Sequence, residues 1–365
     1  MAVFANSLII WFLALMSIPA FLWQPLVAAE LHPEFIHASA KWFLHLNIDQ
    51  LRKTQLWQEV LTRVTKSPEA AKLKAVQTLF GVDLTRDLAD VTFYGADPGG
   101  PLGNAITIIH AQFDAERLKA FLALGDQYAE KRYGNFVFYR MSPDQKLPGQ
   151  HKSSPTPEQF HQPHKKTGAW CTFFRNQYIL IAQHPEALQN AVDVLTMKQA
   201  HIPKYSPLVS GLQSQGTKQT ILQLGILLAE MNVSPPQTAF LKQAQRIQLK
   251  IDQIQDTFAQ STTPESFFAA HLLIVTPDDT TTDRIYRSLD GIRAMIQLKL
   301  GPDPEFTLLC DQLQKIDLIR EKNKVIVSGK FPEPMIIDLL LKKLKQSRRH
   351  NNPSSKQPAV SPPGP

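Results

Sequence analysis

The chain has 365 residues, 43% of them hydrophobic and 19% charged, so it can bury a sizeable core and is not a wholly disordered protein. Its formal net charge is +7, but residues 342–365 carry six basic side chains and no acidic one, and residues 1–29 carry no charged side chain. The body, residues 30–341, therefore carries 7 − 6 = +1, which argues against a nucleic-acid-binding surface on the fold itself. The basic C-terminal segment is expected to be a solubilising, disordered end, and the alternative is weak contact with an anionic surface by charge alone.

The first 29 residues have the pattern of an export signal. An uncharged apolar stretch is followed by Pro25 and by small residues at 27–29, which resemble a signal-peptidase site. We expect cleavage after Ala29 and a periplasmic or envelope-associated protein. The alternative is a retained membrane anchor, because the stretch is nearly long enough to span a bilayer.

The two cysteines, Cys171 and Cys310, leave two interpretations open. In an oxidising compartment they could pair. Their apolar neighbours, AWCTFF and TLLCDQL, fit buried free thiols equally well. Because no cysteine precedes residue 171, acylation of an N-terminal cysteine is excluded.

The first half predicts strands that alternate with helices, on the basis of apolar periodicity. Asp114 is expected to cap a helix, and Pro185 is expected in the first turn of another. The residues at 175–176 are expected to turn a hairpin. Strands are expected at 42–48, 88–96, 105–113, 133–141, 168–174 and 177–183, helices at 50–64, 69–80, 115–131 and 184–198, and an exposed Pro-rich insertion at 142–167.

The second half predicts a similar succession. Asp279 or a nearby threonine is expected to start a long helix, and residues 322–323 are expected to turn a hairpin. Residues 238–255 fit either a helix or a long strand. We expect a strand running into a short helix at 218–231, a strand at 265–277, helices at 279–300 and 331–346, and a hairpin formed by 309–321 and 323–329.

The two halves resemble each other. Residues 176–193 align without a gap on 323–340 at an offset of 147, and 106–122 resemble 273–289 at an offset of 167. We infer an internally duplicated α+β unit of antiparallel sheet with helices packed on one face. The predicted organisation is a signal peptide or anchor at 1–29, a first unit at 30–209, a second unit at 210–345 and a disordered basic tail at 346–365.

The alignment also interprets the sequence His184-Pro185-Glu186. A histidine and a carboxylate beside a strand would fit an active site, but His184 aligns with Phe331, whereas the Pro-Glu pair recurs at 332–333. Proline suits the first position of a helix, and glutamate in the first turn faces the positive end of the helix dipole. The segment therefore predicts a strand-to-helix joint.

Motifs for common enzymes are absent: there is no P-loop, dinucleotide fingerprint, nucleophile elbow or zinc-protease motif. The K-T-G at 166–168 matches penicillin-interacting serine enzymes, but no serine has a lysine three residues later, as those enzymes require. The weak metal candidates are His151, His161 and His164, for which solvated loop histidines are the alternative. No catalytic residue and no cofactor is predicted.

Two further groups of polar residues have structural interpretations. Asp278, Asp279 and Asp283 could hold a divalent cation, but they lie at the start of a predicted helix, so helix capping is favoured. His45 and His110 lie within predicted strands, which is typical of hydrogen-bonded core or interface histidines.

Residues 46–95 resemble uncharacterised exported α+β proteins of environmental bacteria that have an internally duplicated unit. The resemblance implies an exported protein and a duplicated fold, and it brings no activity. The matching positions are Asp49, Leu51, Arg52, Thr54, Leu56, Gly81, Val82, Asp83, Asp87 and Leu88.

Three functions remain open at this point. The first is a non-catalytic binding or structural protein of the cell envelope, whose partner is an envelope protein or an apolar ligand. The second is a periplasmic carrier of an apolar ligand, held between helices and sheet. The third is an enzyme with an unrecognised site, in which histidines and carboxylates with shifted pKa values would share a cleft.

Overall fold

The computed structural model describes most of the chain between residues 30 and 350. The expected signal segment 1–29, the Pro-rich segment 142–167 and residues 351–365 lie outside the described residues. The described residues are 30–67, 70–71, 74, 77–78, 81–83, 85–96, 105–125, 127–141, 168–211, 219–231, 241–256, 265–300 and 307–350.

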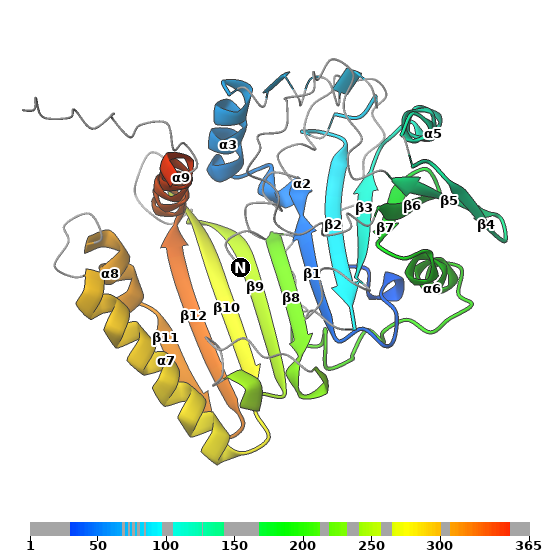
Figure 1. The fold of residues 1–365 in the computed structure, drawn as a ribbon. Coiled ribbons are helices and arrows are strands. Elements are labelled where there is room, and N and C mark those ends of the chain that lie inside the picture. Colours follow the sequence, from blue (N-terminus) through cyan, green and yellow to red (C-terminus); the bar gives the residue numbers. More distant parts are fainter. Residues whose placement is uncertain are drawn as a thin grey trace, which may run out of the picture.

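The fold is α+β, as expected: one antiparallel sheet of twelve strands carries helices packed against it (Figure 1). In the first unit the elements are η1 (Pro33–Phe35), β1 (Trp42–Asn47), α2 (Ile48–Leu51), α3 (Gln55–Thr65), β2 (Leu88–Gly95), β3 (Ile106–Ala111), α5 (Ala115–Ala123), β4 (Glu130–Tyr133), β5 (Phe136–Met141), β6 (Ala169–Phe174), β7 (Tyr178–Ala182) and α6 (Pro185–Leu195). In the second unit they are β8 (Thr220–Leu227), η2 (Leu228–Glu230), β9 (Arg246–Asp256), β10 (Glu265–Val275), α7 (Asp279–Leu300), α8 (Thr307–Gln314), β11 (Asp317–Glu321), β12 (Lys324–Pro332) and α9 (Glu333–His350).

The two units share this sheet rather than forming two separate ones. The strand order is β11-β12-β10-β9-β8-β1-β2-β3-β7-β6-β5-β4, so the units meet where β8 pairs with β1. Leu44 stands opposite Leu224 in the middle of that pair. The boundary expected at 209/210 therefore lies in a connection between α6 and β8, while the backbone hydrogen bonds continue across it.

The same strand order occurs on the two sides of the β1–β8 pair. Outward from the centre the first unit runs β1-β2-β3-β7-β6 and the second runs β8-β9-β10-β12-β11. A helix follows the third strand of each series (α5, α7), and another follows the inner strand of each hairpin (α6, α9). The segments 176–193 and 323–340 each form a strand followed by a helix. This recurrence agrees with the predicted duplication, which itself stays a prediction.

Helices lie on both faces of the sheet in the first unit, whereas the sequence predicted one covered face. On one side, called the α6 face, Leu188 of α6 packs with Phe43 and Leu180. On the other side, called the α3 face, Trp57 of α3 packs with Val91 and, at the margin of the cluster, Leu46 and Ile181. Successive strand residues point to opposite faces, so each apolar strand supplies both clusters.

The second unit has its own core on the α3 face. Leu44, on the α3 face, stands opposite Leu224, which in turn stands opposite Leu249, so all three point to the same face. Ile247, two residues before Leu249 in β9, points to that face as well. Ile247 and Ile274 then pack against Ile285 of α7. In the first unit Leu122 of α5 packs in a cluster that includes Ile181 of the α3 face, so α7 occupies the same face in the second unit as α5 does in the first.

Several predicted boundaries differ from the structure. The helix expected at 115–131 ends at Ala123, and β4 begins at Glu130. The helix expected at 50–64 is split, because Thr54 caps a new helix by accepting a hydrogen bond from the Trp57 amide. Residues 238–255 contain the strand β9, and α9 continues to His350, into the segment expected to be tail.

Candidate functional site

The sequence-predicted metal candidates, His151, His161 and His164, lie outside the described residues. Within the part of the chain that is described, no three metal-binding side chains of the His, Cys, Asp or Glu type come together. The three aspartates at the start of α7 have other partners. Asp278 accepts a hydrogen bond from the Thr281 amide at 2.7 Å, while Asp279 and Asp283 bind Arg320 of β11 at 2.8 and 2.7 Å.

Of the residues expected at the start of α7, Asp278, and not Asp279, binds the first-turn amide. The Thr281 amide lowers the pKa of the Asp278 carboxyl, because the hydrogen bond favours its charged form. The capping interpretation of this acidic segment therefore describes Asp278, whereas Asp279 and Asp283 form ion pairs with Arg320.

His184 occupies the N-cap position of α6, where its side chain makes no capping hydrogen bond, and Pro185 is in the first turn. Glu186 is 68% exposed and bonds Lys131 at 3.2 Å. The backbone amide hydrogen bond of Glu186 itself, together with Lys131, lowers the pKa of its carboxyl. These contacts fit a strand-to-helix joint.

Both cysteines are free and buried, so of the two interpretations left open the buried thiols describe the structure. Burial raises the pKa of the Cys171 thiol to about 12. A thiol with such a pKa stays protonated near neutral pH and is a poor nucleophile.

A row of polar side chains crosses β1, β2, β3 and β7 on the α6 face. His45 Nδ1 lies 2.9 Å from Thr92 Oγ1, and His110 Nδ1 lies 2.9 Å from Asp90 Oδ2. The ring of Tyr178 stacks on that of His110, with centroids 4.6 Å apart. Register explains the row, because His45 stands opposite Thr92, and His110 stands opposite both Asp90 and Tyr178.

This row resembles part of an acid–base site but lacks the rest of one. An aspartate that orients a histidine is a common catalytic pair, provided that a nucleophile and a substrate can reach the other ring nitrogen. His45 and His110 are 3% and 7% exposed, and no hydroxyl or thiol in the described ranges hydrogen-bonds to His110. The expectation of core histidines with hydrogen-bond partners is confirmed.

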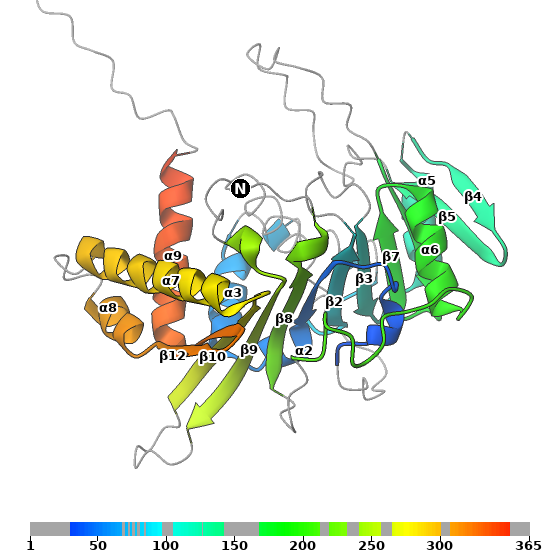
Figure 2. The ribbon, with the colours of Figure 1, turned by 90° about the horizontal axis from the view of Figure 1, so that it is seen from below.

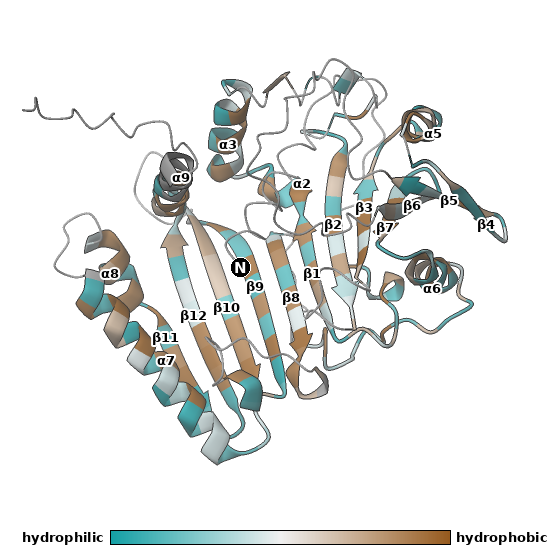
Figure 3. Cartoon of the chain, in the orientation of Figure 1, coloured by the Kyte–Doolittle hydropathy of each residue, from teal (hydrophilic) through white to brown (hydrophobic). Residues whose placement is uncertain are grey.

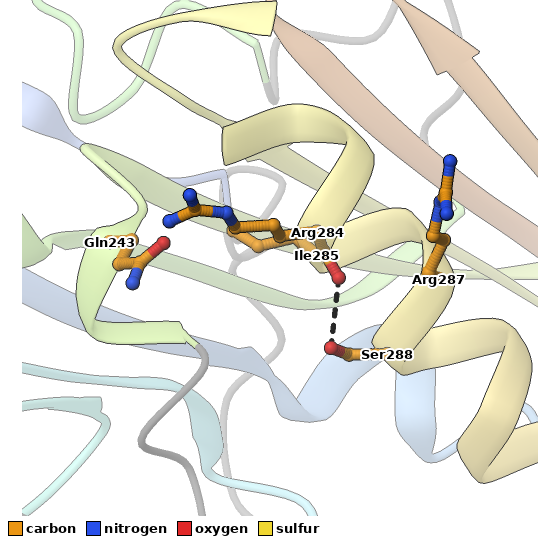
Figure 4. Close-up of a pocket in the computed structure, with 5 residues that line it drawn as sticks. All are labelled: Gln243, Arg284, Ile285, Arg287 and Ser288. Carbon is orange, nitrogen blue, oxygen red and sulfur yellow. Dashed lines mark hydrogen bonds between the residues drawn. The ribbon is translucent and has the colours of Figure 1, made fainter. Parts of the chain in front are cut away.

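A pocket of about 430 Å³ lies against the first half of α7 (Figure 4). It is lined by Gln243, Arg284, Ile285, Arg287 and Ser288. In Figure 4 the side chain of Arg284 points toward Gln243, and that of Arg287 points away from both. Arg287 binds Asp283 at 2.8 Å. Four of the five lining side chains carry polar groups, although carbon atoms supply most of the surface that faces the pocket.

Large apolar side chains are exposed mainly in the second unit. Of the eight found in the described residues, Leu124, Met197 and Tyr205 belong to the first unit, and the other five lie between residues 295 and 340. Those five are Met295 (64% exposed), Leu298 (81%), Leu308 (69%), Ile319 (48%) and Leu340 (42%).

Three of them form what we call the α7–α8 surface: Met295 and Leu298 near the end of α7, and Leu308 in the first turn of α8. Met295 and Leu298 are three residues apart and so lie on one side of the helix. Figures 1 and 2 both show α8 beside the C-terminal part of α7, and Figure 3 shows hydrophobic colouring over much of α8. Sequence reasoning missed this surface, although the apolar residues near the end of the predicted helix 279–300 were a signal for it.

The α7–α8 surface arises because α7 is longer than the core beneath it. Residues 281, 282 and 285 of α7 are buried, whereas none of 291–299 is. A helix of 22 residues spans about 33 Å, and its last turns here have no described core to cover. No helix among the described residues combines the length and the apolar composition needed to cross a bilayer.

Comparisons with known proteins add little to this description. No family model matches the chain, and no curated protein matches it. Solved structures of TP0453 are similar in outline. Crystal form I is 11% identical with a TM-score of 0.38, and the match covers 86% of this chain and 98% of that one. Crystal form IV is 10% identical with a TM-score of 0.41, covering 86% and 97%. Likenesses this distant carry no argument about function.

Proposed function

We propose that the protein is a non-catalytic binding protein of the cell envelope that is exported through its N-terminal segment and binds its partner through the α7–α8 surface. The exposure of Met295, Leu298 and Leu308 is the observation that carries this proposal. Single exposed apolar residues are ordinary, but a group of them on adjoining elements is typical of interaction sites. Burying one such side chain gains about 1.5–3 kcal/mol, so covering all three offsets a large part of the about 4–15 kcal/mol that association costs.

The charge of the C-terminal sequence supports a partner in the envelope. Residues 339–350 include Lys342, Lys343, Lys345, Arg348 and Arg349 and no acidic residue. A chain that has both an exposed apolar surface and a basic segment suits a partner that offers both apolar and anionic groups. Partners of that kind are plentiful in a cell envelope, where the signal-like segment 1–29 would deliver the protein.

The test of binding compares two double variants with equally exposed residues. Met295→Ser/Leu298→Ser removes two of the three apolar side chains of the α7–α8 surface. Leu124→Ser/Tyr205→Ser is the matched control, because those side chains are 72% and 81% exposed in the first unit. Substitutions at such positions change stability by less than about 0.5 kcal/mol. We measure the share of each protein that sediments with washed envelope fractions, before and after protease treatment of the envelopes.

We expect the first variant to lose most of its sedimentation and the control to keep it. Retained binding to protease-treated envelopes identifies lipid as the partner, and lost binding identifies protein. Equal sedimentation of wild type and Met295→Ser/Leu298→Ser would exclude the α7–α8 surface as the binding site. Export is tested separately: mature protein should begin at or near Glu30, and an intact Met1 in a soluble cytosolic fraction would contradict export.

A further inference from the structure

Glu333, the first residue of α9, is completely buried and contacts the other unit. Its Oε1 accepts a hydrogen bond from the Leu56 amide at 2.6 Å, across 277 residues of sequence. Leu56 lies in the first turn of α3, next to Trp57, whose amide is bonded by the cap residue Thr54. Two side chains from two units therefore bind amides that the helix itself leaves without partners.

The equivalent glutamate of the first unit does something else. Glu186 aligns with Glu333 at the offset of 147, yet it is 68% exposed and binds Lys131 on the surface. The same place in the repeated sequence thus serves its own helix in one unit and a distant helix in the other. Helix-dipole reasoning from sequence explains Glu186 and does not explain why Glu333 is buried.

In the part of α9 whose side chains are described, residues 333–342, few side chains are buried. Of residues 333–342, Glu333 is the one that is buried, and the rest are half-buried or exposed. In contrast, α6 has six buried residues, including Leu188, Val192 and Leu195. Figures 1 and 2 both show α9 beside α3, with which it is in contact. Elements with few buried contacts open at lower free energy than the core.

The contact between Glu333 and the Leu56 amide also has an energetic cost. Glu333 Oε2 is buried and has no hydrogen-bond partner. A buried carboxylate with an unsatisfied oxygen is costly, and an apolar side chain of similar size is often as stable at such a place. The contact provides a specific position for α9, because in the described part of the chain the buried oxygen accepts its hydrogen bond from the Leu56 amide at the N-terminus of α3.

We infer that Glu333 is a latch that holds α9 on α3 and that its loss frees α9 while the twelve-stranded sheet stays folded. The latch sets where the basic end of α9 lies relative to the first unit. Glu333 is a positioning residue in this role, which does not depend on the proposed binding function. Because α9 is covalently attached to the end of β12, release changes its orientation and leaves the strand in place.

Hydrogen exchange of the whole mature chain under native conditions tests the latch. Glu333→Leu removes the acceptor at similar volume, Glu333→Gln keeps an oxygen that can accept from Leu56, and Glu186→Leu is the matched control. We expect Leu56 and α9 amides in Glu333→Leu to exchange roughly 10- to 100-fold faster, in line with the loss of a hydrogen bond to a charged group. Amides of β1, β2 and β3 should keep wild-type rates.

The other variants sharpen the result. Glu333→Gln should exchange at rates between those of wild type and Glu333→Leu, because a neutral oxygen accepts the Leu56 amide more weakly than a carboxylate does. Glu186→Leu should leave α3 and α9 unchanged. The latch is overturned if Glu333→Leu leaves Leu56 and α9 protected, if exchange rises equally throughout the sheet, or if the variant fails to fold, since freeing α9 should leave the sheet intact. Wild type gives an independent check: Leu56 and the first turns of α9 should exchange through one common opening, and different opening free energies would contradict a shared contact.

Discussion

The packing at the β1–β8 seam, where the two units meet, can be tested by adding one methyl group. Gly225 of β8 stands opposite Phe43 of β1. A Cβ at Gly225 would lie 2.6 Å from Cε1 of the completely buried Phe43 and would also collide with the carbonyl oxygen of Leu208. Neither neighbour can move easily, since one is a packed ring and the other is backbone. The connection around Leu208 therefore closes over the seam, and only glycine leaves room for it.

We expect Gly225→Ala to destabilise the protein by about 1–3 kcal/mol, which is typical of overpacking in a core. The matched control is Gly291→Ala in α7, where a Cβ has no neighbour within 4 Å. That change should stabilise the protein by about 0.5–1 kcal/mol, because alanine is the better helix former. The same chemical change thus has opposite signs at the two sites.

Equilibrium urea denaturation of the mature chain measures both variants against wild type. The free energy of unfolding should fall for Gly225→Ala and rise for Gly291→Ala, with unchanged denaturant dependence. A Gly225→Ala protein as stable as wild type would show that residues near Leu208 do not lie on the β1–β8 seam.

Three further outcomes follow from individual residues. Asp278→Ala should lower stability at neutral pH, because the Thr281 amide depresses the pKa of the Asp278 carboxyl in the folded state. The difference in stability from wild type should be present above the pKa of the unfolded state and should vanish as pH falls through the pKa of the folded state. Urea titrations at several pH values measure it. The Cys171 thiol, whose pKa burial raises to about 12, should resist a thiol reagent at pH 8 until urea unfolds the protein, and fast reaction in the native state would contradict its burial. Pro185→Gly should cost about 0.4–1 kcal/mol, because glycine frees the unfolded chain at a helix start, and unchanged stability would show that the proline does not fix that start.

Local chemistry explains which parts of the fold the sequence predicts. The hairpin at 175–176 was expected, and Arg175 and Asn176 have φ values of 52° and 53°, as a tight two-residue turn requires. The start of α6 was expected from Pro185 for an equally local reason. Gly125 also carried a signal that was overlooked: the helix expected to reach 131 ends before it, where glycine commonly stops helices.

Other features depend on neighbours that no local pattern describes. Residues 238–255 were ambiguous because Ile247, Leu249 and Ile251 alternate like a strand, whereas Ile254 breaks the alternation. Pairing with β8 and β10 decides the matter. In the same way, the amide partner of Glu333 lies 277 residues away, so the first-turn position of the glutamate could be predicted and its role could not.

A double-mutant cycle tests whether Asp90 and His110 of the buried polar row stabilise the core as a pair. Asp90 and His110 are 4% and 7% exposed and share one hydrogen bond of 2.9 Å. Removing either partner leaves the other buried without its partner, so Asp90→Ala and His110→Ala should each cost about 1–3 kcal/mol. Removing both relieves that penalty, and the double variant should therefore be more stable than the sum of the single losses predicts, by about 1 kcal/mol or more.

The cycle is read by urea denaturation of the four proteins, with Asp290→Ala as a control carboxylate that binds Arg293 at 2.5 Å. Asp290→Ala combined with His110→Ala should be additive, because Asp290 lies on α7 in the second unit, away from β2 and β3. Additive losses for Asp90→Ala and His110→Ala would remove the argument that the pair is a unit of the core. Strong coupling would instead show that Asp90 and His110 form one unit of the core. β2 and β3 can bury these two polar side chains because each provides the hydrogen-bond partner of the other.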